Sequence, residues 1–465
     1  MLAEKGGVEE NLSVEDMRKL VYEALDKLEK IKKREKVLIL PPDATRYTSR
    51  AGELTQIVYD YYGDKITDIM PALGTHKPMT DEQIESMFGS KIPRSLYRVH
   101  DWRNDVVTIG EAPQELVEQA SEGKIKEKWP AQLNKLVWEG GHDLILSIGQ
   151  VVPHEVMGFA NYNKNLFVGV GGPEAINLSH FIGAVYGLER MMGHADNPLR
   201  KVLDYATEHF LKGKLPVVYL QTVVANDDGK LATRGLYISE DRDCFEKAAA
   251  LSLRSNFVLV DKPLKKVVAY LDPKFTTTWL GGKAIYRTRM AMADGGELII
   301  LAPGVDAFGE DDEIDKLIRD YGYRTTPEIM KYLETSRSLM KNLSAAAHLI
   351  HASPENRFTI THCPGHLTRE EIEGVGYQYG DVHEMMKKYD INKLKDGYNM
   401  VDGEEIYFVS KPALGLWGVK ERFTHLTDGA AAEDEANVAA AASSSTPDDE
   451  EETSTAKKQK VDDAE

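Results

Sequence analysis

The sequence predicts an α/β fold with two α/β domains, mainly parallel sheets and a disordered acidic tail. Three observations lead to this prediction. Apolar runs of strand length alternate with amphipathic helical stretches along most of the 465 residues. Polar side chains follow the N-terminal runs, as expected at the ends of parallel strands. From Gly429 onward the chain is rich in Ala, Ser and acidic residues and lacks aromatic residues, so it cannot bury enough apolar surface to order itself.

Local signals predict the individual elements. Ser13 and Asp16 form a capping box that opens a helix, whose apolar residues recur every three or four positions as far as Ile31. A second capping box, Thr80 with Gln83, opens a helix that ends near Gly89. The expected strands are the apolar runs KVLILP (36–41), TDIMPAL (67–73), SLYRV (95–99), DLILSI (143–148), LFVGV (166–170), VVYLQTVV (217–224), FVLVD (257–261), ELIILA (297–302) and EIYFVS (405–410). Helical stretches between such runs are typical of parallel sheets.

The domain boundary is expected where the pattern breaks. Residues 261–282 mix a strand-like piece with Pro, Thr and Gly, which favours a junction there. We therefore expect an N-terminal domain at 1–265, a C-terminal domain at 270–428 and the tail at 429–465.

Composition excludes several classes of protein. The tail has eleven acidic residues against three lysines, so it contributes −8 of the net charge of −18, and the remaining −10 argues against a general nucleic-acid binder. The apolar runs are too short to span a membrane, and the N-terminus lacks the apolar stretch of a secretory signal. Two cysteines, Cys244 and Cys363, indicate a reducing compartment. We expect a cytoplasmic protein and interpret KKQK in the tail as solvated charge rather than a nuclear address.

Polar residues cluster directly after the predicted strands. Ligands of open α/β sheets bind beyond the carboxyl ends of the strands, so these residues are candidates for a site. In chain order they are Asp43, Thr45, Arg46, His76, Lys77, His100, His154, Lys164 and His180.

Each candidate also has a structural explanation when taken alone. His180 lies in an apolar helix and could be a core histidine, Lys164 could be a solvated loop lysine, and His76 could simply hydrogen-bond its own turn. HCPGH (362–366) looks like half of a metal site, but no second half accompanies it, so we interpret it as structural.

Taken together, these motifs resemble the lactate racemase family, whose members carry a nickel pincer nucleotide. The resemblance covers nearly the whole folded chain. It rests on the Asp-x-Thr-Arg loop that begins at Asp43, on the Gly-x-His-Lys-Pro turn at 74–78, and on His100 after the next strand. Its most specific part is the run in which Lys164 follows His154 by ten residues and His180 follows sixteen later.

The resemblance implies a set of cofactor contacts. Lys164 would carry the cofactor as a thioamide and His180 would be the protein ligand of nickel, a metal that suits soft sulfur donors and an imidazole. The cofactor would also contact Asp43, Thr45 and Arg46. The glycine-rich turn before a helix, with Gly171 and Gly172, would offer backbone N–H groups to its phosphate. The site is expected in the cleft between the two domains.

The resemblance also implies the chemistry, which is reversible hydride transfer that racemises or epimerises a 2-hydroxy acid. Two bases are needed for the two hydroxyl positions, and His100 and His154 are the expected pair. The expected substrate contacts are Gly74, Thr75, His76, Lys77 and Lys283, and Arg287 and Arg289 compete for the last role. Lys77 stands where the lactate enzyme has arginine. Lysine cannot make arginine's two parallel hydrogen bonds to a carboxylate, which argues against lactate itself. The expected substrates are therefore lactate-like 2-hydroxy acids and larger hydroxy or sugar acids.

The expected partners are the small-molecule 2-hydroxy acid and the proteins that make the cofactor, while the oligomeric state stays open. Two alternatives remain. One is an NAD-dependent 2-hydroxy acid dehydrogenase, although GVGGPE departs from the G-x-G-x-x-G pattern. The other is a non-catalytic α/β protein that binds partners through its acidic tail.

Overall fold

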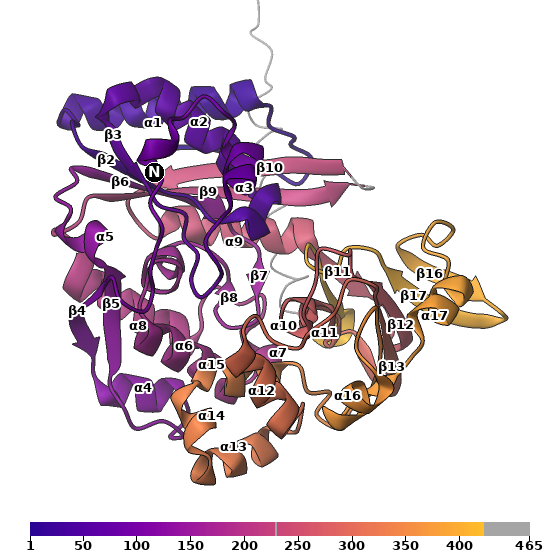
Figure 1. The fold of residues 1–465 in the computed structure, drawn as a ribbon. Helices are drawn as coiled ribbons and strands as arrows, with labels where there is room; N and C mark the ends of the chain where they lie inside the picture. The colour runs from indigo at the N-terminus through magenta and orange to yellow at the C-terminus, as the bar shows by residue number, and fades with distance from the viewer. Residues whose placement is uncertain (228–229, 423–465) are drawn as a thin grey trace, which may run out of the picture. The chain divides into compact units, whose positions relative to one another are not determined.

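The first sheet of the structure comes from the N-terminal half of the chain (Figure 1). The computed structural model describes residues 1–227 and 230–422, and Met1–Lys420 form one compact unit. The sheet has the order β1-β10-β9-β6-β2-β3, and its strands are β1 (Ala3–Gly6), β2 (Val37–Leu40), β3 (Ile66–Ile69), β6 (Leu144–Gln150), β9 (Val217–Asp227) and β10 (Lys230–Ser239). Strands β3, β2, β6 and β9 pair in parallel, and β10 and β1 add an antiparallel edge.

Helices cover both faces of this sheet. Helices α1 (Val14–Ile31), α2 (Ala51–Tyr62) and α3 (Asp81–Phe88) lie on one face and α9 (Asp243–Asn256) on the other (Figure 1). Both predicted capping boxes are present, at Ser13 with Asp16 and at Thr80 with Gln83. The apolar face of α1 is fully buried against the sheet, which explains its three-to-four-residue apolar repeat.

The second sheet comes from the C-terminal half and has the order β15-β14-β13-β12-β17-β16. All neighbours are parallel except β16 and β17. Its strands are β12 (Leu264–Tyr270), β13 (Met292–Ala302), β14 (Thr359–Pro364), β15 (Gln378–Tyr379), β16 (Gly397–Val401) and β17 (Glu404–Val409). Helix α17 (Val382–Lys388) packs on its apolar face.

Short strand pairs and further helices complete the described chain. The pairs are β4 (Val106–Ala112) with β5 (Trp129–Asn134), β7 (Pro153–His154) with β8 (Gly158–Phe159), and β11 (Phe257–Val260) with β18 (Leu416–Val419). The other helices are α4 (Gln114–Ala120), α5 (Lys135–Glu139), α6 (Pro173–Tyr186), α7 (Leu188–Met191), α8 (Pro198–Ala206), α10 (Thr278–Gly281), α11 (Lys283–Thr288), α12 (Asp312–Tyr321), α13 (Thr326–Thr335), α14 (Arg337–Lys341), α15 (Leu343–His351) and α16 (Arg369–Gly374).

One helix pair joins the two halves beside the first sheet. Helix α6 packs against α15, and Ser344 Oγ donates a hydrogen bond to Asn177 Oδ1 at 2.7 Å across this contact. The contact brings side chains of α15 to the carboxyl edge of the first sheet.

The predicted α/β fold class with mainly parallel sheets is confirmed, but two expected strands are wrong. Residues 95–99 form a 3-10 turn, Arg94–Leu96, and then a single bridge from Tyr97 to Ile69. Residues 166–169 belong to a π-helix, Asn165–Gly169, which Val170 ends. The Asn165 amide donates to Leu40 O and Ser147 Oγ and holds this segment beside the strands. A short, fully buried apolar run has no periodicity that separates a strand from a helix.

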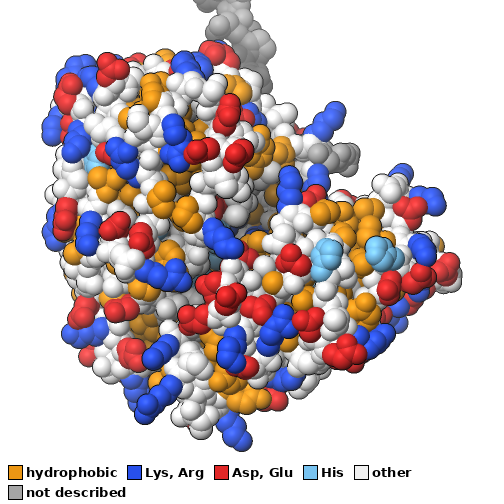
Figure 2. Space-filling view, in the orientation of Figure 1, with side chains coloured by type: hydrophobic (Ala, Val, Ile, Leu, Met, Phe, Trp, Pro, Cys, Tyr) orange, Lys and Arg blue, Asp and Glu red, His pale blue; other side chains and the backbone are white. Residues whose placement is uncertain are grey.

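Other expectations stay predictions. The boundary between 265 and 270 falls just inside β12, and the tail at 429–465 lies outside the described residues. Within residues 1–227 and 230–422, no helix is long and apolar enough to cross a membrane. On the face that Figure 2 shows, acidic and basic side chains of the described residues are interspersed rather than gathered into one basic field.

Candidate active site

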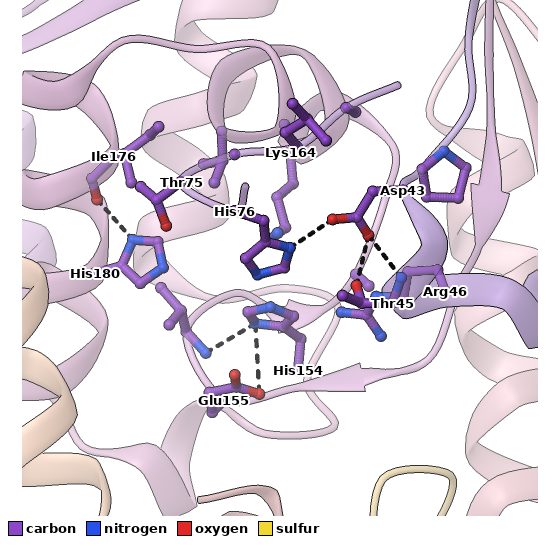
Figure 3. A pocket seen from close by; sticks show the side chains of 18 of the residues that line it. Asp43, Thr45, Arg46, Thr75, His76, His154, Glu155, Lys164, Ile176 and His180 are labelled. Carbon is purple, nitrogen blue, oxygen red and sulfur yellow. Dashed lines mark hydrogen bonds and ion pairs between the residues drawn. The ribbon is translucent and has the colours of Figure 1, made fainter. Parts of the chain in front are cut away.

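A polar cavity lies where the strands β2, β3 and β6 end (Figure 3), and side chains of the second half also line it. The lining residues that carry chemistry are Asp43, Thr45, Arg46, Thr75, His76, His154, Glu155, Asn161, Lys164, His180, Trp279, Lys283, Tyr286, His348 and His351. Parallel pairing of the strands explains why loops far apart in sequence meet here.

The buried Asp43 and the half-buried His76 form a hydrogen-bonded pair. Asp43 Oδ1 accepts from the Thr45 backbone N–H at 3.1 Å and from Thr45 Oγ1 at 2.5 Å, and this cap fixes the carboxylate. Asp43 Oδ2 lies 2.6 Å from His76 Nδ1. Burial opposes ionisation of Asp43, but the charge and hydrogen bond of His76 keep the pKa of this carboxyl below its usual range. Because the carboxylate only accepts, the proton of the neutral His76 ring is on Nδ1, and in that form Nε2 keeps its lone pair.

In His154 the proton is on the other ring nitrogen. Its Nδ1 accepts from the Val156 backbone N–H at 3.1 Å, so the neutral ring carries its proton on Nε2. Burial lowers the pKa of His154 well below the usual value, and Glu155 Oε2, 3.9 Å from Nδ1, opposes that shift. Two imidazoles therefore face one cavity, one as an acceptor and the other as a donor (Figure 3).

Lys164 points into the same cavity from a tight turn. Asn161 and Tyr162 have positive φ values of 66° and 57°, which are uncommon for residues other than glycine, and they reverse the chain just before the lysine. Among the described residues, no ion pair or hydrogen bond engages Lys164 Nζ. Burial, together with the charge of Arg46, lowers the pKa of Lys164 to about 7, so a large fraction of this amine is neutral at neutral pH.

His180 faces Lys164 across the cavity from helix α6. Its Nδ1 lies 2.7 Å from the Ile176 carbonyl oxygen, one helical turn earlier, so Nδ1–H donates and Nε2 keeps its lone pair. Burial lowers the pKa of His180 to about 4 and keeps the ring neutral. A neutral imidazole oriented by a carbonyl is the form that ligates metals.

Lys283 is the cation that the second half contributes. Burial and the charge of Arg46 lower its pKa to about 8, and its Nζ lies 5.7 Å from the centre of the Phe275 ring. The two competing arginines lie outside the cavity lining. Arg287 Nη1 donates to Gly415 O at 3.3 Å, and Arg289 is held by Glu189 and by backbone carbonyls.

Four expected site residues do not line this cavity. His100 is 2% exposed, its Nε2 lies 3.0 Å from Gly171 O, and its Nδ1 lies 3.0 Å from the Asn134 amide. Burial lowers the pKa of His100 to about 4. Both of its nitrogens are therefore engaged within the core.

Gly171 and Gly172 lie at the start of α6, but Gln132 fills the position expected for a phosphate. Gln132 Oε1 accepts from the Ala175 backbone N–H at 3.2 Å, and a Cβ on Gly172 would lie 2.4 Å from that oxygen. Lys77 is exposed and faces the acidic loop at residues 306–312, whereas Gly74 and Thr75 of the same turn line the cavity.

Six of these lining residues were not expected from the sequence, namely Glu155, Asn161, Trp279, Tyr286, His348 and His351. Glu155 is adjacent to His154, so it was a detectable candidate. The two histidines are spaced i, i+3 on α15, a same-face signal, but their proximity to the first sheet depends on the α6–α15 contact.

The fold and the cavity define the class of protein, an α/β protein with a polar cavity at the carboxyl edge of its first sheet. Residues 8–191 match the family model of the lactate racemase N-terminal domain. A lactate racemase from Thermoanaerobacterium thermosaccharolyticum is 26% identical over 259 residues, which span 52% of this chain and 53% of that protein. The match thus spans about half the length of this curated relative.

Two solved structures resemble the fold. A crystal structure of a Thermotoga maritima protein has a TM-score of 0.76 and 26% identity, covering 90% of this chain and all of that chain. The lactate racemase apoprotein from Thermoanaerobacterium thermosaccharolyticum has a TM-score of 0.63 and 17% identity, covering 88% and 89%, and supports the fold alone. The resemblance to the lactate racemase family is therefore confirmed, and it is carried by residues 8–191, which match the family's N-terminal domain model.

We expect His100→Ala to destabilise the protein by about 2 kcal/mol, because the Asn134 amide and the Gly171 carbonyl lose a buried partner. Urea unfolding of the variant and the parent measures this difference. An unchanged unfolding midpoint would contradict the structural role assigned to this ring.

Lys164 should react with amine-directed reagents faster than ordinary lysines, by about tenfold or more at pH 7.5. A lysine with a pKa of about 7 becomes neutral as the pH rises through 7, whereas an ordinary lysine does so near 10.4. Peptide mass mapping across a pH series measures the labelling rate, with exposed Lys77 as the internal reference. Equal rates for the two lysines would exclude a depressed pKa.

Proposed function

We propose that this protein racemises or epimerises a 2-hydroxy acid with the help of a nickel pincer nucleotide. One observation supports this most strongly. The Lys164 amine and the His180 imidazole meet in one cavity, each with its reactive nitrogen available, in a chain whose N-terminal residues match the lactate racemase family.

The residues fit such a cofactor. Lys164 would hold it, because a largely neutral amine can form an amide-type bond. His180 would ligate nickel through Nε2. Among residues 1–227 and 230–422, no group of three or more His, Cys, Asp or Glu side chains could hold a metal ion by itself. This agrees with a metal that arrives with most of its ligands supplied by the organic group.

When bound, the cofactor would supply the acceptor and donor of a hydride at the substrate's α-carbon. The proton on the substrate hydroxyl must be handled by the protein. We assign its removal to His76, whose neutral ring would accept the proton at Nε2 and whose imidazolium form would be stabilised by Asp43. This assignment replaces His100, which is sealed in the core.

We assign His154 to the second half of the reaction, in which the 2-keto acid takes the hydride back. Its Nε2–H would hydrogen-bond to the oxygen of the 2-keto acid and polarise the carbonyl for hydride return. The proton that the product hydroxyl needs would then come back from the His76 imidazolium, so that no net proton is gained or lost. Glu155 would stabilise the ring whenever it carries a second proton.

Arg46 and Lys283 are the cations that we assign to the substrate carboxylate. They line the cavity from opposite halves of the chain. An NAD-dependent dehydrogenase is disfavoured, because Gln132 occupies the start of α6 where the pyrophosphate of a dinucleotide would bind. The proposed racemase activity would therefore require the proteins that synthesise the cofactor.

Protein produced together with those cofactor-making proteins should carry nickel and an added covalent mass, and Lys164→Ala should lose both. Intact-protein mass spectrometry and nickel analysis measure the two quantities. Lys77→Ala is the matched control and should retain both, because Lys77 lies outside the cavity. An unmodified mass for the parent protein would overturn the assignment of Lys164.

His76→Gln should lower kcat by about 10²- to 10⁴-fold, because it removes the proton acceptor while keeping a polar side chain of similar size. Chiral chromatography of a 2-hydroxy acid after reaction measures the rate. Asp43→Asn should also lower kcat, since the imidazolium loses its anionic partner. Full activity of His76→Gln would contradict the role of this ring.

A further inference from the structure

A second cavity, which we call the acidic groove, lies beside the turn that carries Lys164. Its walls are formed by Tyr162 of that turn, by side chains within residues 204–219 and by residues 240–243. Its volume of about 640 Å³ suits a small molecule. Five carboxylates and two cationic side chains are among the groups that line it, so the groove carries an excess of negative charge.

Two buried phenols open into this groove. Tyr162 and Tyr219 are 5% and 2% exposed, and both line it. Their ring centres lie 4.5 Å apart, and Tyr162 also stacks on Phe245 at 5.3 Å, so packing fixes both rings. Neither phenolic oxygen makes a hydrogen bond to a described residue, yet neither oxygen is completely buried. The small accessible part of each side chain therefore includes its hydroxyl, which is available to a ligand in the groove.

A partly compensated carboxylate lies near these phenols. The charge of Asp204 helps to raise the pKa of Tyr162, which places the two groups close together. Asp204 Oδ1 accepts from Asn163 Nδ2 at 2.7 Å, and its other oxygen pairs with Arg242. Burial nevertheless raises the pKa of Asp204 above its usual value. A further cation would therefore be favoured beside this carboxylate.

Two more carboxylates of the groove are free to pair with a ligand. Glu240 and Asp241 are exposed and make no ion pair with a described residue, whereas each remaining carboxylate of the groove pairs with a cation of the protein. Apolar side chains, among them Leu211, Leu215 and Val217, line the same groove. The groove thus combines phenolic and carboxylate oxygens with an apolar surface.

These groups favour an organic cation as the occupant. Within residues 1–227 and 230–422, no group of three or more His, Cys, Asp or Glu side chains could hold a metal ion. An ammonium group donates hydrogen bonds to phenols and carboxylates, and the methylene groups of an aliphatic amine can pack on apolar side chains. An anionic ligand would meet the excess negative charge of the groove.

We propose that the acidic groove binds a short aliphatic diamine in its doubly charged form. One ammonium group would donate to the phenols of Tyr162 and Tyr219 beside Asp204. The other would lie beside Glu240 and Asp241. This inference goes beyond the proposed function and does not depend on it, because the groove and the active-site cavity share no lining residue.

The groove and the active-site cavity are nevertheless connected by one turn. Tyr162 lines the groove, and Lys164 lines the cavity. Between them, the Asn163 side chain donates to Asp204 at 2.7 Å and accepts from Arg200 Nη1 at 2.6 Å. A diamine bound at Asp204 would therefore contact the residues that hold the Lys164 turn in place.

The test is isothermal titration calorimetry of the full, cofactor-free chain with putrescine, butanediol and succinate at fixed ionic strength. These probes have four carbons each and carry two positive charges, no charge and two negative charges. We expect saturable binding of one putrescine per chain and no binding of the other two. Absence of putrescine binding, or equal binding of butanediol, would overturn the proposal.

Two variants locate the binding in the groove. Tyr219→Phe should weaken putrescine binding about tenfold or more, because a hydrogen bond to a charged group is lost. Asp241→Asn should weaken it about two- to fivefold, because an exposed ion pair contributes less, and a change at this exposed side chain leaves the core intact. The acidic tail also attracts cations. Binding to the tail would be unchanged in both variants, and that result would contradict the proposal.

The matched control is Tyr237→Phe, which removes another buried phenolic hydroxyl, on the neighbouring strand β10. Tyr237 is 8% exposed and lies outside the groove, so this variant should bind putrescine as the parent protein does. An equal loss of affinity in Tyr237→Phe and Tyr219→Phe would assign the effect to packing and overturn the site. Since every titration uses cofactor-free protein, the result is independent of whether a hydroxy acid is racemised.

Discussion

The parallel pairing of β2 with β3 and β6 is the constraint on which the site depends. Parallel strands end at the same edge of a sheet, so the loops after residues 40, 69 and 150 converge although up to about a hundred residues separate them. The packing of α6 against α15 then brings the second half over that edge. Without the first contact the histidines of the first half would lie apart, and without the second the cavity would lack Lys283, Tyr286 and the histidines of α15.

Three histidines around the cavity share one arrangement. One ring nitrogen of each is hydrogen-bonded to the protein, and the other ring nitrogen is left for a ligand. Asp43 holds His76, the Ile176 carbonyl holds His180, and the Val156 amide holds His154. In each case the partner determines which ring nitrogen carries the proton, and so whether the ring accepts or donates in the cavity. The Tyr286 hydroxyl lies 2.7 Å from His348 Nδ1 in a similar contact.

Several features of the cavity lower the stability of the folded protein. Lys164 and Lys283 are buried without a paired anion among the described residues, and Asn161 and Tyr162 adopt left-handed backbone conformations. Such features persist where the surrounding structure holds them, and they are typical of sites that bind a ligand. The proposed cofactor would relieve part of this cost, because an amide-type bond removes the charge of Lys164.

The sequence by itself determined the α/β class, both capping boxes, seven of the nine expected strands and the run from His154 through Lys164 to His180, because these depend on local periodicity and spacing. The tertiary structure alone decided that His76 faces the cavity and His100 the core, since both follow the β3 region and differ only in what packs against them. It also decided that Gln132 occupies the start of α6 and that the Tyr286 hydroxyl contacts His348. These outcomes depend on hydrogen bonds between residues distant in sequence, which spacing along the chain does not encode.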